Sequence, residues 1–286
     1  MRNSSVAYTD CLNGLCPSDT TGPPRCSQLN TRPIFPEVLC WGTSITYSQM
    51  WSMAAKETSR INQPWGSVLE ENRLTDFEAF WTLPPDWFEP INTSGGGWSG
   101  VTRLTLGSSN EVFFVKRQQT QRRFTPRFPL GALTYRLEYN VLRRDIPIGK
   151  PDWVYFGESS RENLASSVLV TRALPEQFIQ LDRLALSNEH TAFNANPGNF
   201  QEIGAQLCAM HQHRFRHGAL FARHIYINPE TCEVRLVDFE RSRYCLSATA
   251  AARKDLQQFL RRDHGLNEQQ LDALLTPYRT HLPSAL

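Results

Sequence analysis

Two short stretches in the second half of the chain decide the fold: HGALFARHI (residues 217–225) and VRLVDFE (residues 234–240). We expect strands at 225–227 and 234–239, joined as a hairpin by the turn sequence Asn-Pro-Glu at 228–230. Asp238 lies at the end of the second strand, which is apolar and predicted to be buried, and a carboxylate placed there is well suited to hold Mg²⁺. An aspartate that only caps a turn has the same local sequence, so the rest of the chain must decide.

A glycine-rich stretch and a lysine precede these motifs. SGGGWSG (residues 94–100) contains Gly95, Gly96, Gly97 and Gly100, and it leads into predicted strands at 101–106 and 112–116. Glycine lets backbone N–H groups approach a phosphate chain closely. Lys116 ends the second strand, where its ammonium could contact the α- and β-phosphates of a nucleotide. A plain turn and a solvated lysine are the alternatives for these two features.

A helix is predicted over 130–144, with Leu133, Leu137 and Val141 at helical spacing. Glu138 lies on this helix, where an ion pair could orient Lys116. An exposed helical glutamate is the alternative. The five elements, in this order and spacing, are more specific than any one of them.

The remaining elements place strands before helices. Thr75 and Glu78 form a capping-box pattern that predicts a short helix ending before 84–85, and strands are expected at 154–156 and 168–171. Two helical faces are predicted in the second half, one formed by Phe200, Ile203, Leu207 and Met210 and the other by Leu256, Phe259 and Leu260. The order predicts an α+β fold with a β-rich N-terminal lobe at 53–174 and a small, mainly helical C-terminal lobe at 175–286.

Composition sets further bounds. Of the 286 residues, 40% are hydrophobic and 20% charged, and the net charge of +2 is too small to predict a nucleic-acid partner. No apolar run is long enough to span a membrane, and the first residues lack the apolar core of a signal peptide, so we expect a cytoplasmic protein. The seven cysteines lack paired Cys-x-x-Cys spacing, which favours free thiols over disulfides or a zinc site.

Residues 1–52 differ from the rest. They are rich in Ser, Thr and Pro and show no sustained periodicity. We expect either a disordered tail or an upstream extension that does not belong to the natural protein, with translation starting at Met50 or Met53.

Four stretches together resemble the lipopolysaccharide kinase (Kdo/WaaP-type) family, and within it the InaA-like branch: GWSGV (97–101), VKR (115–117), HGALFARHI (217–225) and VDFERSR (237–243). The resemblance covers roughly residues 75–262. It implies a bacterial protein with a protein-kinase-like fold, whose relatives use ATP and Mg²⁺ to phosphorylate lipopolysaccharide core sugars. The reaction class is a phosphotransferase with an alcohol group as acceptor.

The same resemblance assigns roles by position. Lys116 would contact phosphates, Glu138 would pair with it, His217 would brace the catalytic loop and Asp238 would bind Mg²⁺. Active sugar kinases of the family have aspartate two residues after the loop histidine, and this chain has Ala219 there.

His224 occupies the position at which protein kinases have asparagine. Imidazole is a poor ligand for Mg²⁺, so we expect a hydrogen-bonded structural histidine, with metal ligation as the alternative.

Three functions stay open. Retention of Lys116, Glu138 and Asp238 favours an ATP-dependent kinase acting on a sugar or lipopolysaccharide-type hydroxyl. Ala219 favours a pseudokinase, meaning a nucleotide-binding regulatory or scaffold module. A protein kinase is the third, disfavoured because the sequence after Asp238 is short for an activation segment and substrate-docking helices.

A basic stretch adds an expectation about partners. It is predicted to be a loop in which arginines alternate with two aromatic residues: Arg117, Arg122, Arg123, Phe124, Arg127 and Phe128. Such a loop could contact anionic lipid at the inner face of the inner membrane or a phosphorylated sugar. A solvated basic loop is the alternative.

Overall fold

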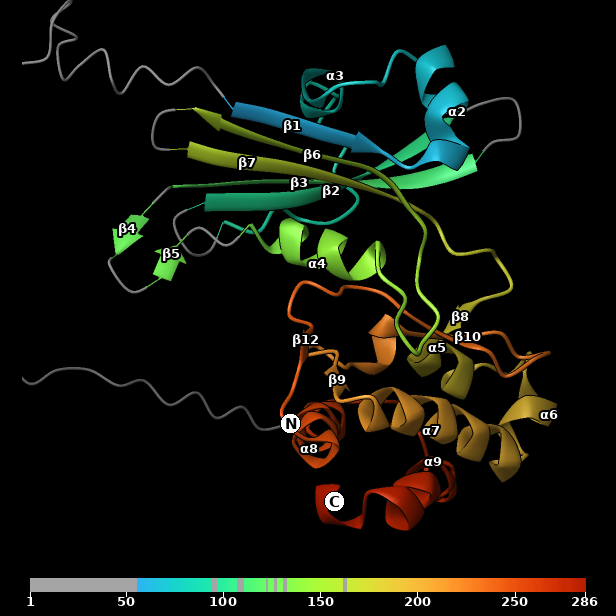
Figure 1. The fold of residues 1–286 in the computed structure, drawn as a ribbon. Coiled ribbons are helices and arrows are strands. Elements are labelled where there is room, and N and C mark those ends of the chain that lie inside the picture. Colours follow the sequence, from blue (N-terminus) through green and yellow to red (C-terminus); the bar gives the residue numbers. More distant parts are fainter. Residues whose placement is uncertain are drawn as a thin grey trace, which may run out of the picture. The chain divides into compact units, whose positions relative to one another are not determined.

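The computed structural model describes residues 56–93, 97–106, 111–121, 123–125, 128–130, 133–161 and 164–286. A β-rich part precedes a mainly helical part, as the sequence predicts (Figure 1). The 1–52 stretch, for which a tail or extension was predicted, lies outside the described residues. Within the described ranges, no helix has the length and apolar character needed to cross a membrane.

The N-terminal lobe is built on a five-stranded antiparallel sheet of order β1-β6-β7-β3-β2. Its strands are β1 (Lys56–Ile61), β2 (Gly97–Leu106), β3 (Glu111–Gln121), β6 (Trp153–Arg161) and β7 (Leu164–Arg172). The predicted strands at 101–106, 112–116, 154–156 and 168–171 are confirmed as parts of β2, β3, β6 and β7. β1 was not predicted, because KETSRI has a single strongly apolar residue and lies at the edge of the sheet.

Side chains alternate between the two faces of β3, and this alternation sets up the site. Phe113 and Val115 are fully buried in a cluster with helices α2 (Gly66–Glu71) and α3 (Phe77–Trp81). Lys116 therefore points to the opposite face, where helix α4 (Thr134–Leu142) packs (Figure 1).

Helix α3 begins with a different cap from the one predicted. Asp76, rather than Thr75, is the N-cap residue, and its carboxylate accepts a hydrogen bond from the Ala79 N–H at 2.8 Å. An aspartate fills this role as well as a threonine, so the pattern predicted the helix correctly and its first residue wrongly.

Helix α4 is shorter than the predicted span 130–144, and its buried face differs. Tyr135, Glu138, Tyr139 and Leu142 are buried, whereas Leu137 is 42% exposed. The buried set follows the i, i+3, i+4, i+7 spacing of a helix face, and Tyr139 stacks on a sheet residue, Phe156, with ring centroids 4.1 Å apart. Of the predicted apolar face, Leu133 is buried and Val141 packs against the core, and only Leu137 was wrongly placed.

Arg117 is not part of an exposed basic loop, which corrects that prediction. It lies inside β3 and is 3% exposed; its guanidinium donates to the carbonyl oxygens of Trp81 at 3.0 Å and Leu83 at 2.7 Å. It also stacks on Trp87 at 4.6 Å. Arg117 thereby fastens the segment 81–87 to the sheet.

The rest of the basic stretch forms the short hairpin of β4 (Arg123–Thr125) and β5 (Phe128–Leu130). Arg122 and Arg127 lie outside the described residues. Contact with anionic lipid stays a prediction.

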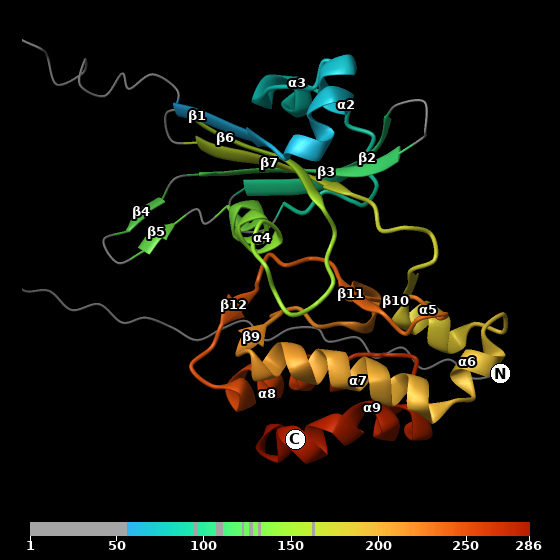
Figure 2. The same cartoon turned by 45° about the vertical axis from the view of Figure 1, so that its right-hand side comes forward.

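The C-terminal lobe packs short strands and helices around a second core. Its predicted hairpin is confirmed as β10 (Ile225–Ile227) and β11 (Val234–Leu236), but β11 ends three residues before the predicted 239, and the backbone is left-handed at Asp238. The predicted buried face of α7 (Pro197–Gln212) is confirmed as well. Leu260 was wrongly placed on the buried face of α8 (Ala248–Leu260), where it is 42% exposed. Figure 2 shows α7 lying between the short strands and α9 (Glu268–His281).

The remaining elements of this lobe are short: β8 (Ile179–Gln180), α5 (Leu181–Leu186), α6 (Thr191–Asn194), β9 (Phe215–Arg216), η3 (Ala222–His224), β12 (Arg243–Tyr244) and η4 (Pro283–Ala285). The three described cysteines, Cys208, Cys232 and Cys245, are free thiols.

Candidate active site

Lys116 and Glu138 form a bidentate ion pair. The Lys116 Nζ lies 2.7 Å from both Glu138 carboxylate oxygens, and both side chains are largely buried. Burial would lower the pKa of Lys116, but Glu138, Asp238 and Glu240 outweigh it and raise that pKa. The lysine is therefore held as a fixed cation, which is the form that contacts phosphate oxygens.

The segment before the glycine-rich stretch pairs with the start of β2, upstream of the predicted hairpin. Asn92 and Ser99 exchange two backbone hydrogen bonds, at 2.9 and 2.8 Å, and the Phe88 N–H donates to the Val101 carbonyl at 2.7 Å. The segment from 87 to 92 therefore pairs with the start of β2. Gly95 and Gly96 lie outside the described residues.

Gly97 and Gly100 lie within β2 and allow close packing there. A Cβ on Gly100 would stand 2.5 Å from the Trp87 ring, and one on Gly97 would stand 2.2 Å from the Gln119 carbonyl oxygen. A side chain at Gly97 would push β2 away from β3, and a side chain at Gly100 would displace Trp87 from β2. Direct contact of either glycine with a phosphate stays a prediction.

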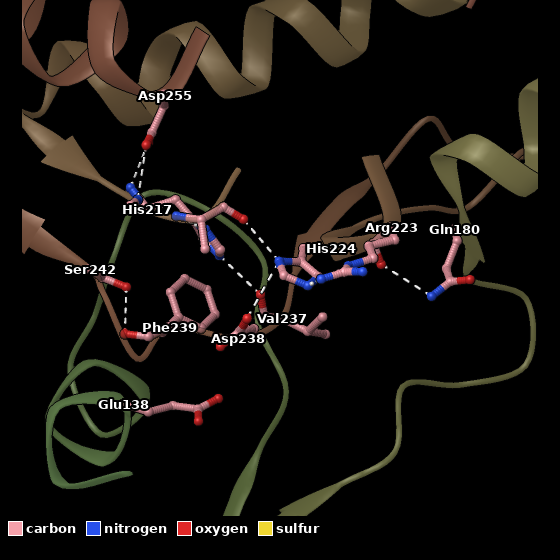
Figure 3. Close-up of polar contacts among 12 residues, drawn as sticks. Glu138, Gln180, His217, Arg223, His224, Val237, Asp238, Phe239, Ser242 and Asp255 are labelled. Carbon is pink, nitrogen blue, oxygen red and sulfur yellow. Dashed lines mark hydrogen bonds and ion pairs between the residues drawn. The ribbon is translucent and has the colours of Figure 1, made fainter. Parts of the chain in front are cut away.

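Asp238 lies two residues after the end of β11. Its backbone is left-handed, with φ +68°, and its carboxylate is partly exposed. The carboxylate lies 3.5 Å from His224 Nδ1 and is close enough to Lys116 to raise the pKa of that lysine. Figure 3 shows Glu138 extending toward the Asp238–Phe239 backbone, and the Phe239 N–H stabilises its carboxylate.

Glu240 is a third carboxylate at the site that sequence reasoning missed. Burial and the negative charge of Glu138 raise its pKa to about 7, while the Thr134 side chain hydrogen-bonds to it. The signal was present in the motif, since VDFE carries two acids two residues apart.

His217 is held as a neutral ring beneath this loop. Its Nε2 donates to the Val237 carbonyl at 2.9 Å, and its Nδ1 accepts from the Ala219 N–H at 3.3 Å. Burial lowers the pKa of His217 to about 4. The ring thus connects the two motifs, because it joins 217–219 to the residue before Asp238 (Figure 3).

Asp255, on α8, anchors the same loop and was also missed. Its carboxylate accepts the backbone N–H groups of His217 at 2.7 Å and Gly218 at 2.9 Å, and it lies 3.2 Å from His211 Nε2. Burial opposes the charge, but these donors, His211 first among them, outweigh burial and lower the pKa of Asp255. The missed signal was a carboxylate on the apolar face of a predicted helix, where an acid needs several partners.

Ala219 and His224 complete the loop without a proton acceptor at the usual position. Ala219 is 5% exposed, and its carbonyl accepts from His224 Nδ1 at 2.8 Å. The other ring nitrogen of His224 accepts from Arg223 Nε at 3.2 Å. Both imidazole nitrogens therefore have partners within the protein. Among the described residues there is no group of three His, Cys, Asp or Glu side chains placed to hold a metal ion.

Two known proteins are similar to this chain. Escherichia coli (strain K12) protein InaA is 25% identical over 194 residues, covering 65% of this chain and 87% of InaA. The structure of WaaP in complex with acyl carrier protein superposes with a TM-score of 0.55 at 17% identity, covering 78% of this chain and 89% of WaaP, which shows a shared fold.

The lipopolysaccharide kinase (Kdo/WaaP) family model matches residues 78–278, a span that contains the lysine–glutamate pair, the histidine loop and Asp238. The chain therefore belongs to the lipopolysaccharide kinase (Kdo/WaaP) family.

Proposed function

We propose that this protein transfers the γ-phosphoryl group of ATP to a hydroxyl of a lipopolysaccharide-type sugar, with Mg²⁺ held at Asp238. The observation that carries the proposal is the buried Lys116–Glu138 pair facing Asp238 across the two lobes. Burying two charged side chains costs desolvation free energy that their attraction only partly offsets, so stability alone does not account for the pair, and a role for a fixed cation does. A nucleotide phosphate chain is the ligand that such a cation serves in kinase folds.

We assign each residue of the site a role in nucleotide binding. Lys116 would contact the α- and β-phosphates, and Glu138 would keep its ammonium in place. The hairpin closed by Asn92 and Ser99 would cover the phosphates with backbone N–H groups. The metal, when bound, neutralises charge that develops on the transferring group.

The donors fit magnesium better than a softer ion. Asp238 offers a partly exposed carboxylate, and Mg²⁺ commonly takes one or two protein carboxylates together with phosphate oxygens and water. His224 is the less suitable ligand because its nitrogens are already hydrogen-bonded, to the Ala219 carbonyl and Arg223.

The acceptor side of the site predicts slow transfer. Ala219 cannot take a proton from the acceptor hydroxyl, and a general base typically contributes about 10²–10⁴-fold in rate. Phosphoryl transfer relies mostly on positioning and charge, so a reduced rate is expected rather than none. Ala219 is also the observation that favours the second candidate, a pseudokinase that binds nucleotide and transfers nothing.

Labelled ATP separates the two candidates. The protein is incubated with γ-labelled ATP, Mg²⁺ and rough-type lipopolysaccharide, and label on the lipopolysaccharide is measured alongside nucleotide binding by calorimetry. Transfer above that of Asp238→Ala supports the kinase. Nucleotide binding without transfer supports the pseudokinase, and no Mg²⁺-dependent binding contradicts both.

A further inference from the structure

Two arginines stack on one aromatic ring in the catalytic loop. Phe221 is half-buried, and the guanidinium of Arg223 lies 5.5 Å from its ring centroid while that of Arg262 lies 5.6 Å away. Arg223 belongs to the loop itself, whereas Arg262 follows the end of α8. Two positive charges from distant parts of the sequence are therefore gathered at one ring.

Neither guanidinium has a carboxylate partner among the residues that the structure describes. Asp263, the acid next to Arg262 in sequence, accepts the Gly265 N–H instead. Stacking uses the face of a guanidinium and leaves its edge free to donate hydrogen bonds. Both guanidinium carbons lie within 5.6 Å of the Phe221 ring centroid, so an anion bound beside this ring would be attracted by both charges.

Arg223 makes two hydrogen-bond contacts within the protein, one through its side chain and one through its backbone. Its Nε donates to His224 Nε2 at 3.2 Å, and its carbonyl accepts from the Gln180 side chain at 3.1 Å (Figure 3). The His224 ring in turn packs edge-on against Phe221 at 5.3 Å. A cation fixed by its own neighbours loses less conformational entropy when it binds a ligand.

The arginine pair is also next to the reaction site. His224 separates Arg223 from Asp238, whose carboxylate lies 3.5 Å from His224 Nδ1. A sugar whose hydroxyl faced Asp238 and Lys116 would extend past His224 and bring a substituent close to Phe221.

We propose that Arg223 and Arg262 bind a phosphate group carried by the acceptor, so that the acceptor class is a sugar that is already phosphorylated. This inference rests on the proposed kinase function, whose acceptor it specifies. Guanidinium groups recognise phosphate through paired N–H donors, and a phosphate dianion matches two cations in charge. The Phe221 ring would offer an apolar surface to the sugar ring.

Direct binding tests this without turnover. With the nucleotide site saturated by Mg²⁺ and a non-hydrolysable ATP analogue, glucose 6-phosphate and glucose are titrated into the protein and followed by ³¹P and ¹H NMR. We expect the phosphorylated sugar to bind and glucose to bind at least tenfold more weakly. Arg223→Gln and Arg262→Gln should each weaken glucose 6-phosphate binding about tenfold, because each removes a charge-assisted contact.

Arg253→Gln is the matched control. It lies on the same helix as the residues leading to Arg262 and carries the same charge, but its guanidinium contacts the Ser284 carbonyl. An equal loss of binding in Arg253→Gln would mean a general charge effect and would overturn the proposal, as would unchanged binding in the double variant Arg223→Gln/Arg262→Gln.

The nucleotide is titrated separately into every variant. If both arginine variants lose nucleotide affinity as much as sugar phosphate affinity, the pair serves ATP and the acceptor assignment is wrong. If wild-type protein binds no nucleotide, the kinase proposal fails on its own, and the sugar phosphate titration still decides whether the arginine pair binds phosphate.

Discussion

The two halves of the candidate site differ in what they retain. Around Lys116 the charged groups are complete, with a cation held by Glu138 and facing Asp238. Around Ala219 the supporting frame is complete, because Asp255 and His217 fix the loop backbone, yet the position that would take a proton carries a methyl group. The half around Lys116 therefore retains both its reactive charges and the contacts that position them. The half around Ala219 retains only the contacts that position the loop.

Under the proposed function, nucleotide binding and acceptor activation depend on separate parts of the molecule. The lysine–glutamate pair spans β3 and α4, whereas the loop is anchored from α8. A change at one residue of the loop can therefore remove an activity without loosening the other half.

The largest expected effect on phosphoryl transfer comes from substitutions in the half of the site around Lys116. Lys116→Met and Asp238→Asn should each lower phosphoryl transfer by about 10³-fold or more, because both remove charge that stabilises the transferring group. Steady-state assays with labelled ATP measure this. Lys254→Met, an exposed lysine on α8, is the control and should leave the rate unchanged. Equal rates for Lys116→Met and wild type would refute the role of the pair.

Removing the carboxylate that anchors the loop at 217–219 should have the next largest effect, which is on stability. Asp255→Asn replaces a carboxylate oxygen by an amide that cannot accept the same N–H groups, so buried donors of His217 or Gly218 lose their partner. We expect unfolding in urea to show a stability loss of about 3 kcal/mol. Asp263→Asn, an exposed acid just after α8, should change stability little. A loss below about 0.5 kcal/mol in Asp255→Asn would mean that the loop is held by other contacts.

Restoring the missing acceptor should have a smaller effect, in the opposite direction. Ala219→Asp should raise transfer about 10²-fold if the rest of the site is intact, the lower end of what a general base supplies. The gain is limited because the position is nearly buried. Ala219→Asn is the matched control, since it has the same shape and does not act as a base. Equal rates for the two variants would show that proton transfer is not what the loop lacks.

The smallest effect concerns acid sensitivity. Because the pKa of His217 is lowered to about 4, the unfolded chain binds a proton between pH 6.5 and 4 that the folded protein does not, and stability falls as the pH falls through that window. The groups facing the ring are Asp255, Asp238 and His224. Urea unfolding at pH 7 and pH 4.5 should show wild type losing on the order of 2 kcal/mol more than His217→Gln. Parallel losses in both proteins would place the acid sensitivity elsewhere.

Sequence patterns predicted the charged residues around Lys116 well, and they predicted the residues that anchor the loop at 217–219 poorly. Lys116 and Glu138 could be found because each lies on a strongly patterned element whose spacing from the other is typical of the fold. Asp255 could not, because a helix period gives the buried face but does not state which loop that face meets. Arg117 was misplaced because β3 continues beyond Lys116, and a strand residue that stacks on a tryptophan has the same local sequence as a surface arginine.

Glu240 shows the same limit at shorter range. The motif VDFE states its position, but its environment depends on Glu138 and Thr134, which belong to the other lobe. Local sequence therefore predicts where such an acid lies, and only tertiary packing determines its pKa.

The left-handed backbone at Asp238 lowers the stability of the folded protein at the residue proposed to bind the metal. A residue with a side chain pays of order 1 kcal/mol to adopt φ +68°, and glycine does not. Asp238→Gly should consequently make the protein more heat-resistant while removing the carboxylate proposed to hold magnesium. Selection for thermal stability alone would therefore favour glycine at position 238, which removes the proposed metal ligand. A stability screen of this protein should also measure phosphoryl transfer.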